Sequence, residues 1–466
     1  MKSKIVESPA AAVADIADGA SIVVGGFGVL HGWPSSVLAA LRDRAVRDLT
    51  LICNTPGFGP LSPQILADKH QVKKLVASFG GYPYRKTPIE EAIGRGEVEF
   101  ELVPQGTLAE RLRAGGAGLA GFFTPTGVGT DVERGKEVRE FDGRRHVFER
   151  ALTADVSVVR AHAADPAGNL VFRGSGRNFH PVFATAGRTT IAEVDELVGL
   201  GDLDPEHVVT PGIFVDRVVR ATLRMTRDEV IDMVRQIGRT APDAGGLPGI
   251  PPDLMAMRAA ALFARGSVVN LGIGLPTLCS NYVAGREIML HAENGFLNYG
   301  PFPEPGSEDV HLYNAGGQLV TALPGAAFTH TCDAFAMARG GRVDTIVLGG
   351  FQVAENGDLA NWKAPHMSAG GVGGAMDLAA GRAELIVLMY HTSKDGQSKL
   401  LRRCNYPLTA IGCVSKIVTN LALIEVIPGQ GFFLREVAPG IGVEEVQRAT
   451  EAPLRVAPDV REMRFD

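Results

Sequence analysis

The chain has 466 residues, of which 45% are hydrophobic and 21% are charged, an ordinary composition for a globular protein with at least two domains. Its formal net charge of -6 comes from 46 basic and 52 acidic residues spread along the chain without a long basic block, which argues against nucleic acid as a partner. No apolar run of about 18 residues is free of charges and glycine clusters, so we expect no membrane span.

The N-terminal segment has no apolar core of signal-peptide length, and Glu7, Asp15 and Asp18 come too early for a transit peptide. The 5 cysteines are an odd number without a CxxC pair, which argues against a disulfide framework or a zinc site. The 11 histidines show no HxxxH or HxH spacing and are expected to be surface or structural residues. We therefore predict no metal and a reducing, cytoplasmic location.

Short β-branched runs alternate with helix-period segments along both parts of the chain. The expected strands of the first part are Ile22–Val24, Leu49–Ile52, Leu75–Ala77 and Val98–Leu102, and those of the second part are Val268–Leu271, Ile288–Leu290, Ile346–Leu348 and Leu385–Leu388. Residues 11–38 and 258–283 share one order of features: an Ala-rich helix, a turn, an apolar strand, a glycine-spaced loop, then a proline and a new helix. The sequence therefore predicts an α/β protein of two related halves, each a mostly parallel sheet with flanking helices.

A segment rich in proline and glycine, RTAPDAGGLPGIPP, separates the two halves from Arg239 to Pro252. Such a composition suits an exposed linker better than a packed element. We place the first domain at residues 1–238, the linker at 239–254 and the second domain at 255–466.

One acidic residue, Glu293, stands where the expected strand Ile288–Leu290 ends and the loop Asn294-Gly295 begins. Parallel α/β sheets build their sites at the carboxyl ends of strands, and Asn-Gly permits a tight, positive-φ turn that would aim an exposed carboxylate outward. From these residues alone, Glu293 is either a catalytic carboxylate or a solvated loop acid that caps a following helix.

Three glycine-rich loops suggest close approach of a ligand to bare backbone. Gly25-Gly26-Phe27-Gly28 and Gly272-Ile273-Gly274 follow strands, but neither completes GxGxxG or GxxxxGK[ST], so tight packing explains them as well as phosphate binding does. The cluster Gly370–Gly374 offers backbone N–H groups for an oxyanion hole, with a flexible loop as the alternative. No GxSxG elbow with supporting context favours a serine hydrolase.

An ordered set of motifs covers almost the whole chain from about Asp18 onward. In chain order they are VPQGTLAERLRAGGAG (103–118), FTPTGVGT (123–130), EVREFDG (137–143), GNLVFRGSGRNF (168–179), AENG (292–295), NAGG (314–317), LPG (323–325), GDLANW (357–362) and GGAMDL (373–378). Together they closely resemble the family I coenzyme A transferases, and within that family the succinyl-CoA:3-oxoacid type. The resemblance implies that the first half corresponds to the family's α chain, that the second half corresponds to its β chain, and that the linker fuses them.

The resemblance also implies roles for individual residues. Glu293 takes the position of the catalytic nucleophile, the Gly374 N–H that of the oxyanion donor, and Asn54 faces the acyl oxygen, while Gln105 is a weaker candidate for holding the acid. Gly373, Gly374 and Asn314 are expected to contact CoA. From the residues alone, Asn54 equally forms an Asx turn, Gln105 satisfies local backbone and Gly374 serves conformation.

The chemistry implied is transfer of CoA from an acyl-CoA to a carboxylic acid, with no permanently bound cofactor. A carboxylate can attack a thioester directly because the thiolate leaves well, its conjugate thiol having a pKa of about 8.5. An acyl-glutamyl anhydride and then a glutamyl-CoA thioester would form, with ping-pong kinetics. The family resemblance further implies a homodimer or a dimer of dimers.

Several positions depart from the usual pattern of the 3-oxoacid enzymes, chiefly on the side expected to bind the acid. Trp33 lies in a loop that is one residue longer, Gly317 stands where a lysine is common, and Ala292 replaces a serine beside Glu293. Lost cationic groups disfavour a small dicarboxylate and suggest a larger or less polar acyl acceptor. Hydrolysis of acyl-CoA, cleavage of a cyclic acyl-CoA, and a non-catalytic ligand-sensing role remain as alternatives.

Overall fold

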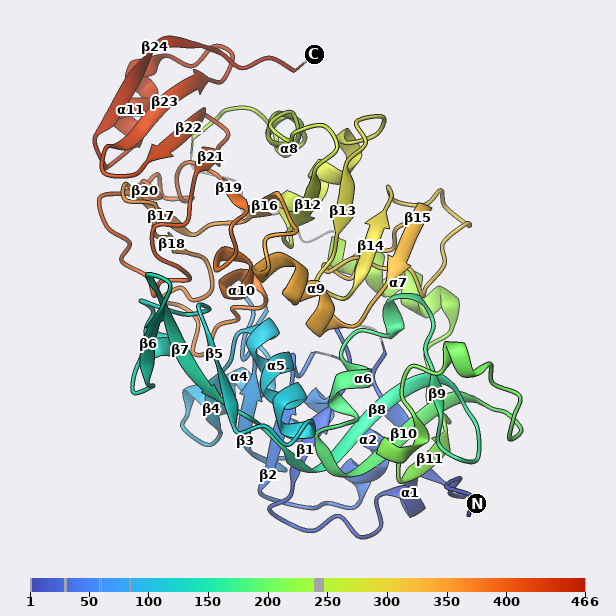
Figure 1. The fold of residues 1–466 in the computed structure, drawn as a ribbon. Helices are drawn as coiled ribbons and strands as arrows, with labels where there is room; N and C mark the ends of the chain where they lie inside the picture. The colour runs from blue at the N-terminus through green and yellow to red at the C-terminus, as the bar shows by residue number, and fades with distance from the viewer. Residues whose placement is uncertain are drawn as a thin grey trace.

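The computed structural model describes residues 2–28, 32–57, 59, 61–83, 85–238 and 247–465. It contains two large sheets, one from each half of the chain (Figure 1). Residues 239–246 of the expected linker lie outside the described residues, and helix α8 begins at Pro252, so the last residues assigned to the linker are helical. The domain boundaries themselves stay a prediction.

The first sheet follows the order β11-β10-β8-β1-β2-β3-β4, and each neighbouring pair along that path is parallel. Its strands are β1 (Ser21–Val24), β2 (Leu49–Cys53), β3 (Val72–Ala77), β4 (Glu99–Leu102), β8 (Ala154–Ala164), β10 (Gly187–Leu197) and β11 (Arg217–Arg220), with β9 (Leu170–Val171) antiparallel on β8. A small antiparallel sheet of β5 (Gly121–Thr124), β7 (Arg144–Arg150) and β6 (Val138–Phe141) stands beside it. All four strands expected in this half are confirmed.

The second sheet follows the order β15-β14-β13-β12-β16-β19-β21-β22-β23-β24. Its strands are β12 (Val268–Leu271), β13 (Met289–His291), β14 (Phe296–Tyr299), β15 (Ala322–Phe328), β16 (Thr345–Leu348), β19 (Glu384–Leu388), β21 (Lys416–Val418), β22 (Ala422–Ile427), β23 (Gly431–Val437) and β24 (Leu454–Glu462). The centre from β13 to β21 is parallel, whereas antiparallel pairs join β14 and β15 at one end and β22 and β23 at the other. A separate small sheet holds β17 (Gln352–Ala354), β18 (Leu359–Ala360) and β20 (Leu400–Leu401).

The two halves repeat one arrangement around their first strands. Strand β1 pairs in parallel with β2 and β8, and β12 pairs in parallel with β13 and β16. The repeat seen between residues 11–38 and 258–283 therefore corresponds to equivalent positions in the two sheets. Two of its expected helices differ: α1 spans only Pro9–Ala12, and Leu275–Tyr282 forms a 3-10 helix, η5.

Helices flank the two sheets, as expected. They are α2 (Ser35–Asp43), α3 (Gln64–Ala67), α4 (Pro88–Gly94), α5 (Gln105–Gly116), α6 (His180–Phe183) and α7 (Arg227–Gly238) in the first half, and α8 (Pro252–Ala260), α9 (Thr331–Arg339), α10 (Ala375–Ala379) and α11 (Val443–Ala449) in the second. Short 3-10 turns lie at Asp131–Glu133, Gly174–Gly176, Pro205–His207 and Gly212–Phe214. Among the described residues, no helix is long and apolar enough to cross a membrane.

The halves meet through α5, which packs against α9 and α10 (Figure 1). One hydrophobic cluster contains buried residues of both halves, including Leu108 and Phe183 from the first and Phe296 and Cys332 from the second. Because this cluster is shared, the loops at the carboxyl ends of β2, β3 and β4 are held against the second half. That contact is where the candidate site lies.

Candidate active site

Glu293 lies in a tight turn that connects β13 to the antiparallel strand β14. The Gly295 N–H donates to the Ala292 carbonyl (3.0 Å), and the Ala292 N–H donates to the Phe296 carbonyl (2.9 Å). Gly295 has φ +94°, and a Cβ there would come 2.1 Å from the Thr329 carbonyl oxygen, so only glycine fits. The turn expected from Asn294-Gly295 is confirmed, and a strand rather than a helix follows it.

The expectation that the Glu293 carboxylate is exposed was wrong, because the residue is only 8% exposed. Burial, together with the negative charge of Asp377, raises its pKa to about 8. No hydrogen bond or ion pair joins its carboxylate to another described residue. The protein therefore buries an acid without a partner, which stabilises structures poorly but is common at functional sites.

His291 precedes Glu293 by two residues, but its contacts are those of a structural histidine. Its Nε2–H donates to the Ala334 carbonyl (3.0 Å), and its Nδ1 accepts from the Asn270 amide (3.0 Å). Burial lowers the pKa of His291 to about 4, so the ring is neutral at physiological pH. It is not available as a general base, in agreement with the sequence prediction that most histidines are structural.

Gly374 lies directly against the Glu293 carboxylate. A Cβ on Gly374 would come 2.6 Å from Glu293 Oε2 and 2.7 Å from Phe335 Cζ, so any side chain here would force one of these groups to move. Gly374 is the N-cap of α10, and its N–H has no acceptor among the described residues. A backbone N–H without an acceptor is the kind of donor that an oxyanion hole requires.

The Gly370–Gly373 segment is pinned to the first half by backbone hydrogen bonds. The Gly370 carbonyl accepts from the N–H groups of Gly80 (2.8 Å) and Gly81 (3.1 Å), and the Val372 N–H donates to the Ser78 carbonyl (2.9 Å). The flexible-loop alternative for this cluster therefore does not hold.

Close packing explains why this segment is made of glycines. A Cβ on Gly371 would come 2.3 Å from the Phe79 ring, and one on Gly373 would come 2.6 Å from the same ring. The Phe79 ring in turn stacks on Tyr82, with 6.0 Å between the ring centroids. Side chains at Gly371 or Gly373 would push the two halves apart.

Gln105 bonds to this segment directly, whereas Asn54 bonds to the first-half residues that contact it. The Asn54 carbonyl accepts from the N–H groups of Ser78 (3.0 Å) and Phe79 (3.2 Å), and the Gln105 N–H donates to the Gly373 carbonyl (2.9 Å). Both side chains are buried, yet Asn54 Oδ1 and Gln105 Nε2 have no hydrogen-bond partner among the described residues. Buried polar atoms without partners are costly, and a polar substrate is one way to satisfy them.

Asn314 differs from these residues because its side chain is already engaged. Its Oδ1 accepts from the N–H groups of Gly316 (3.0 Å) and Gln318 (3.1 Å), while its Nδ2 donates to the Gln318 side chain (3.1 Å). These bonds shape the loop that carries Gly317. Contact of Asn314 with CoA stays a prediction that the structure does not test.

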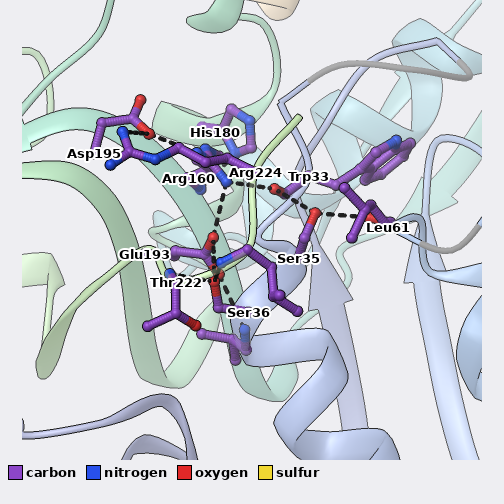
Figure 2. A network of polar contacts seen from close by, with 12 residues as sticks. Trp33, Ser35, Ser36, Leu61, Arg160, His180, Glu193, Asp195, Thr222 and Arg224 are labelled. Carbon is purple, nitrogen blue, oxygen red and sulfur yellow. Dashed lines mark hydrogen bonds and ion pairs between the residues drawn. The ribbon is translucent and has the colours of Figure 1, made fainter. Parts of the chain in front are cut away.

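Trp33 is held in place by an arginine-centred network shown in Figure 2. The Trp33 carbonyl accepts from Arg160 Nη1 (3.2 Å), and the same Nη1 donates to Glu193 (2.8 Å). Burial raises the pKa of Glu193 to about 7, partly offset by Arg160. Trp33 is 3% exposed, and a Cβ on Gly26 would come 2.3 Å from its ring, so Trp33 itself is tightly packed.

A cavity of about 330 Å³ opens beside this network, at the carboxyl ends of β8 and β10. Trp33, Arg160, Arg224 and Tyr313 are among its lining residues, whereas Glu293, Gly374, Asn54 and Gln105 are not. The residues expected to act on the substrate therefore lie outside this cavity. Among the described residues, no group of three or more His, Cys, Asp or Glu side chains could hold a metal ion.

One residue near Glu293 escaped the sequence analysis. Asp377 is fully buried on α10 and makes contacts across both halves. Its motif, GGAMDL, drew attention through its glycines, while the acid three residues after Gly374 received no role. An acid in the first turn of a short, otherwise apolar helix was the available signal.

The sequence pattern of the coenzyme A transferase family matches residues 6–221 and 253–449, which cover both halves. The chain therefore belongs to the coenzyme A transferase family. It is 39% identical over 484 residues to the mitochondrial succinyl-CoA:3-ketoacid coenzyme A transferase 2A of Rattus norvegicus, an alignment that covers 99% of this chain and 91% of the rat protein. The close resemblance seen in the sequence is thereby confirmed.

Relatives that are single subunits of two-chain enzymes match about half of this chain each. One, from a probable succinyl-CoA:3-ketoacid coenzyme A transferase of Bacillus subtilis, is 46% identical over 48% of this chain and 93% of its own length. Another, from a 3-oxoadipate CoA-transferase of Pseudomonas putida, is 52% identical over 43% of this chain and 94% of its own length. The fold agrees as well: an acyl-CoA transferase of Escherichia coli O157:H7, in a thioester complex with CoA, superposes with a TM-score of 0.82 at 21% identity over 100% of this chain and 96% of its own.

Proposed function

We propose that this transferase moves CoA from an acyl-CoA to a 3-oxo acid through a covalent thioester on Glu293. The observation that carries the proposal is the contact between Gly374 and Glu293: a buried carboxylate without a partner among the described residues lies against a glycine whose N–H has no acceptor among them. The first group supplies a nucleophile, and the second stabilises the charge that develops on an attacked carbonyl.

The first half-reaction uses Glu293 as its carboxylate. Its oxygen attacks the thioester carbonyl, and the Asn54 amide faces the acyl oxygen as the C–S bond breaks. The products are an acyl-glutamyl anhydride and the CoA thiolate. The thiolate then attacks the glutamyl carbonyl, whose oxyanion accepts from the Gly374 N–H. The donor acid leaves as a carboxylate, and a glutamyl-CoA thioester remains.

The second half-reaction reverses these steps with a different acid. The acceptor carboxylate, held by Gln105, attacks the glutamyl thioester and expels the CoA thiolate, which then attacks the new anhydride at the acceptor acyl carbon. Glu293 is released as a carboxylate, and the acceptor leaves as its CoA ester. Because a thioester is exchanged for a thioester, the reaction needs no ATP and no metal.

The raised pKa of Glu293 bears directly on this chemistry. With a pKa of about 8, most of the free enzyme holds Glu293 protonated at pH 7, and only the ionised fraction reacts. The ionised form is a stronger nucleophile than an ordinary carboxylate, because burial withholds the water that would stabilise its charge. Binding energy from the distant parts of CoA helps to offset the cost of that desolvation.

The names of the relatives and the space around Gly317 support the choice of acid. The rat protein is named for succinyl-CoA and a 3-ketoacid, and the Pseudomonas protein for 3-oxoadipate. In this chain, Gly317 has no heavy atom within 4 Å of the place where a Cβ would stand. Open space without a lysine favours a 3-oxo acid that is larger or less polar than succinate.

Intact-mass measurement tests the covalent step. After mixing with acetoacetyl-CoA or succinyl-CoA in the absence of an acceptor, the wild-type protein is expected to gain the mass of CoA less one water, and Glu293→Ala is expected to gain nothing. Adding an acceptor acid should discharge the adduct and yield the acceptor's CoA ester. Release of free acid and CoA without any acceptor would point to hydrolysis. Absence of both adduct and turnover with every acyl-CoA would overturn the proposal.

A panel of acids tests the substrate class. Acetoacetate, longer 3-oxo acids, 3-oxoadipate, succinate and acetate are compared as acceptors at equal concentration with the preformed enzyme–CoA adduct. We expect the 3-oxo monocarboxylic acids to discharge it fastest. Faster discharge by succinate or 3-oxoadipate would place a cationic group in the acid site and contradict the reasoning from Gly317.

We also propose a cytoplasmic location and assembly as a homodimer or dimer of dimers. The unpaired state of Cys53, Cys279, Cys332, Cys404 and Cys413 supports a reducing compartment. The rat and human relatives are named mitochondrial, so cell fractionation is the deciding measurement for location. Sedimentation equilibrium gives the number of chains in solution, and a monomer would contradict the proposed assembly.

A further inference from the structure

Asp377 has no part in the reaction described above, yet it is the most heavily bonded group beside the site. It is 0% exposed. Its Oδ2 accepts from the Gly106 N–H (2.8 Å), and its Oδ1 accepts from the hydroxyls of Thr107 (3.1 Å) and Thr126 (3.2 Å). All three donors belong to the first half, whereas Asp377 belongs to the second.

Two of these donors stand at the start of α5, which lacks a cap of its own. The N-cap position is Pro104, whose side chain makes no capping hydrogen bond. The first N–H groups of a helix need acceptors, and a carboxylate there also interacts favourably with the helix dipole. Asp377 therefore caps a helix of the opposite half, which brings α5 and α10 into one fixed arrangement.

That arrangement matters because each helix begins with a residue of the candidate site. Helix α5 starts at Gln105, and α10 starts immediately after its N-cap, Gly374. The Gln105 N–H also donates to the Gly373 carbonyl (2.9 Å), so two independent contacts hold these residues together. A shift of α10 relative to α5 would move the Gly374 N–H and the Gln105 side chain at once.

We propose that Asp377 is a positioning residue that sets the Gly374 N–H and the Gln105 amide relative to Glu293. This inference rests on the proposed function of the site. The hydrogen bonds that Asp377 accepts from neutral donors contribute more to this positioning than its ion pair does. Arg339 approaches Asp377 at 3.5 Å, while its closer partner is Glu110 at 2.9 Å. A displacement of about 1 Å in a reacting group can reduce a rate about a hundredfold.

The test measures how fast the enzyme–CoA adduct forms at saturating acyl-CoA, using rapid mixing and intact mass. Asp377→Ala removes every cross-half hydrogen bond of this side chain and is expected to slow adduct formation about a hundredfold. Asp377→Asn keeps one acceptor for the Gly106 N–H, and the threonine hydroxyls can turn to accept from its amide. It should therefore recover part of the rate, with a loss of about tenfold. Rates are compared at pH 9, where Glu293 is mostly ionised in each protein.

Glu436→Gln is the matched control for the loss of a buried carboxylate. Glu436 is 3% exposed and bonds to Arg258 and Arg461, which lie in the second half and do not contact the site. This variant is expected to lose stability while it forms the adduct at the wild-type rate per folded molecule. If both Asp377 variants also react at that rate, Asp377 is only structural and the proposal is overturned.

A pH profile separates the effect of the Asp377 charge on Glu293 from its effect on position, because the rate at pH 9 depends little on the Glu293 pKa. Asp377 is the charged neighbour that raises the pKa of Glu293, after burial itself. Among the described residues, Arg339 on α9 also faces Asp377 at 3.5 Å and keeps its place in both Asp377 variants. Tyr299 on β14 interacts with Glu293, and Cys279 on η5 interacts with Tyr299; burial raises the pKa of both, so both stay neutral. In Asp377→Asn the acid limb of the rate should therefore move to lower pH than in the wild type. An unmoved limb together with an unchanged rate at pH 9 contradicts the proposal.

Failure of this inference and failure of the proposed function give different results. If the wild-type protein forms no CoA adduct, the proposed function fails, and the positioning role falls with it. If the wild type forms the adduct and the Asp377 variants match it, the covalent function stands and only the positioning role falls. Should Asp377→Ala not fold, Asp377→Asn and its pH profile decide alone.

Discussion

Glu293 and Glu436 are both buried carboxylates of the second half, and they have opposite surroundings. Desolvation raises the pKa of Glu436, but hydrogen bonds and charges from Arg258 and Arg461 outweigh it, so the net pKa is lowered. Glu293 has no such partner among the described residues, and its pKa rises to about 8. Burial alone therefore does not show that an acid is structural. A paired buried carboxylate holds the fold together, while an unpaired one lowers stability and has the raised pKa that is common at functional sites.

The largest expected effect comes from filling the contact beside Glu293. Gly374→Ala would place a Cβ 2.6 Å from Glu293 Oε2, so either the carboxylate or the α10 N-cap must move. Alanine keeps the backbone N–H but moves it relative to Glu293, and we expect adduct formation to fall about 10²- to 10³-fold, as when an oxyanion donor is lost. The measurement is the adduct formation rate by intact mass. Gly442→Ala at the N-cap of α11, where a Cβ meets nothing within 4 Å, is the control and should keep the wild-type rate.

The sequence could predict those features of the site that depend on neighbouring residues, but not those that depend on residues distant in the chain. The turn at Glu293 was predictable, because Asn294-Gly295 after an apolar strand is a local signal. The burial of Glu293 was not, since it depends on Gly374 and Phe335, which are distant in the sequence and reach it only through packing. The family motifs indicated that Gly374 and Glu293 belong to one site, but they did not reveal the contact that joins them.

Contacts between residues distant in the chain also explain why the role of Asp377 could not be predicted. Asp377 acts by capping a helix far earlier in the chain, as the separation of 271 residues from Gly106 shows. No periodicity or spacing rule reaches that far. The boundary near residue 239 stays a prediction, whereas Pro252, which was assigned to the linker, starts helix α8 because proline is favoured in a first helical turn.

Stability measurements can test whether Glu293 and Glu436 have opposite effects on the free energy of unfolding. Glu293→Gln is expected to raise the free energy of unfolding by on the order of 5 kcal/mol above pH 8, because the pKa rises from 4.5 to about 8 and each tenfold change in an acid dissociation constant corresponds to about 1.4 kcal/mol. The folded-state pKa of Glu293 is raised, so the acid favours the folded state below pH 4.5 and loses that advantage as pH rises to about 8. The gain from Gln should grow across this window.

Glu436→Gln should act in the opposite direction, with a loss of about 3 kcal/mol at neutral pH because Arg258 is left buried without its partner. The folded-state pKa of Glu436 is lowered, so its contribution is present above the unfolded-state value and disappears as pH falls through the folded-state value. Urea unfolding of both variants between pH 5 and pH 9 measures these effects. Two changes of the same sign would contradict the division into reactive and structural acids.

A smaller effect is expected in the pH dependence of the wild-type enzyme. Only ionised Glu293 attacks a thioester, so the rate of adduct formation should fall tenfold for each pH unit below about 8 and level off above it. His291 cannot produce this limb, because burial lowers its pKa to about 4. Pre-steady-state mass measurement from pH 5.5 to pH 9.5 gives the profile. A rate that stays level down to pH 5.5 would show that bound substrate or solvent stabilises the carboxylate as an ordinary surface acid.

The smallest effect concerns the acid rather than the nucleophile. Gly317→Lys adds a cation where this chain has open space, although φ +77° at Gly317 strains any other residue. A lysine that reaches the acid site would pair with a second carboxylate, and we expect succinate and 3-oxoadipate to discharge the enzyme–CoA adduct a few-fold faster, about 1 kcal/mol of preference. Gly317→Met carries a similar strain without the charge and separates the two causes. If both variants change the discharge rates of the acids to the same extent, the backbone conformation rather than the missing charge sets the preference among acids at this loop.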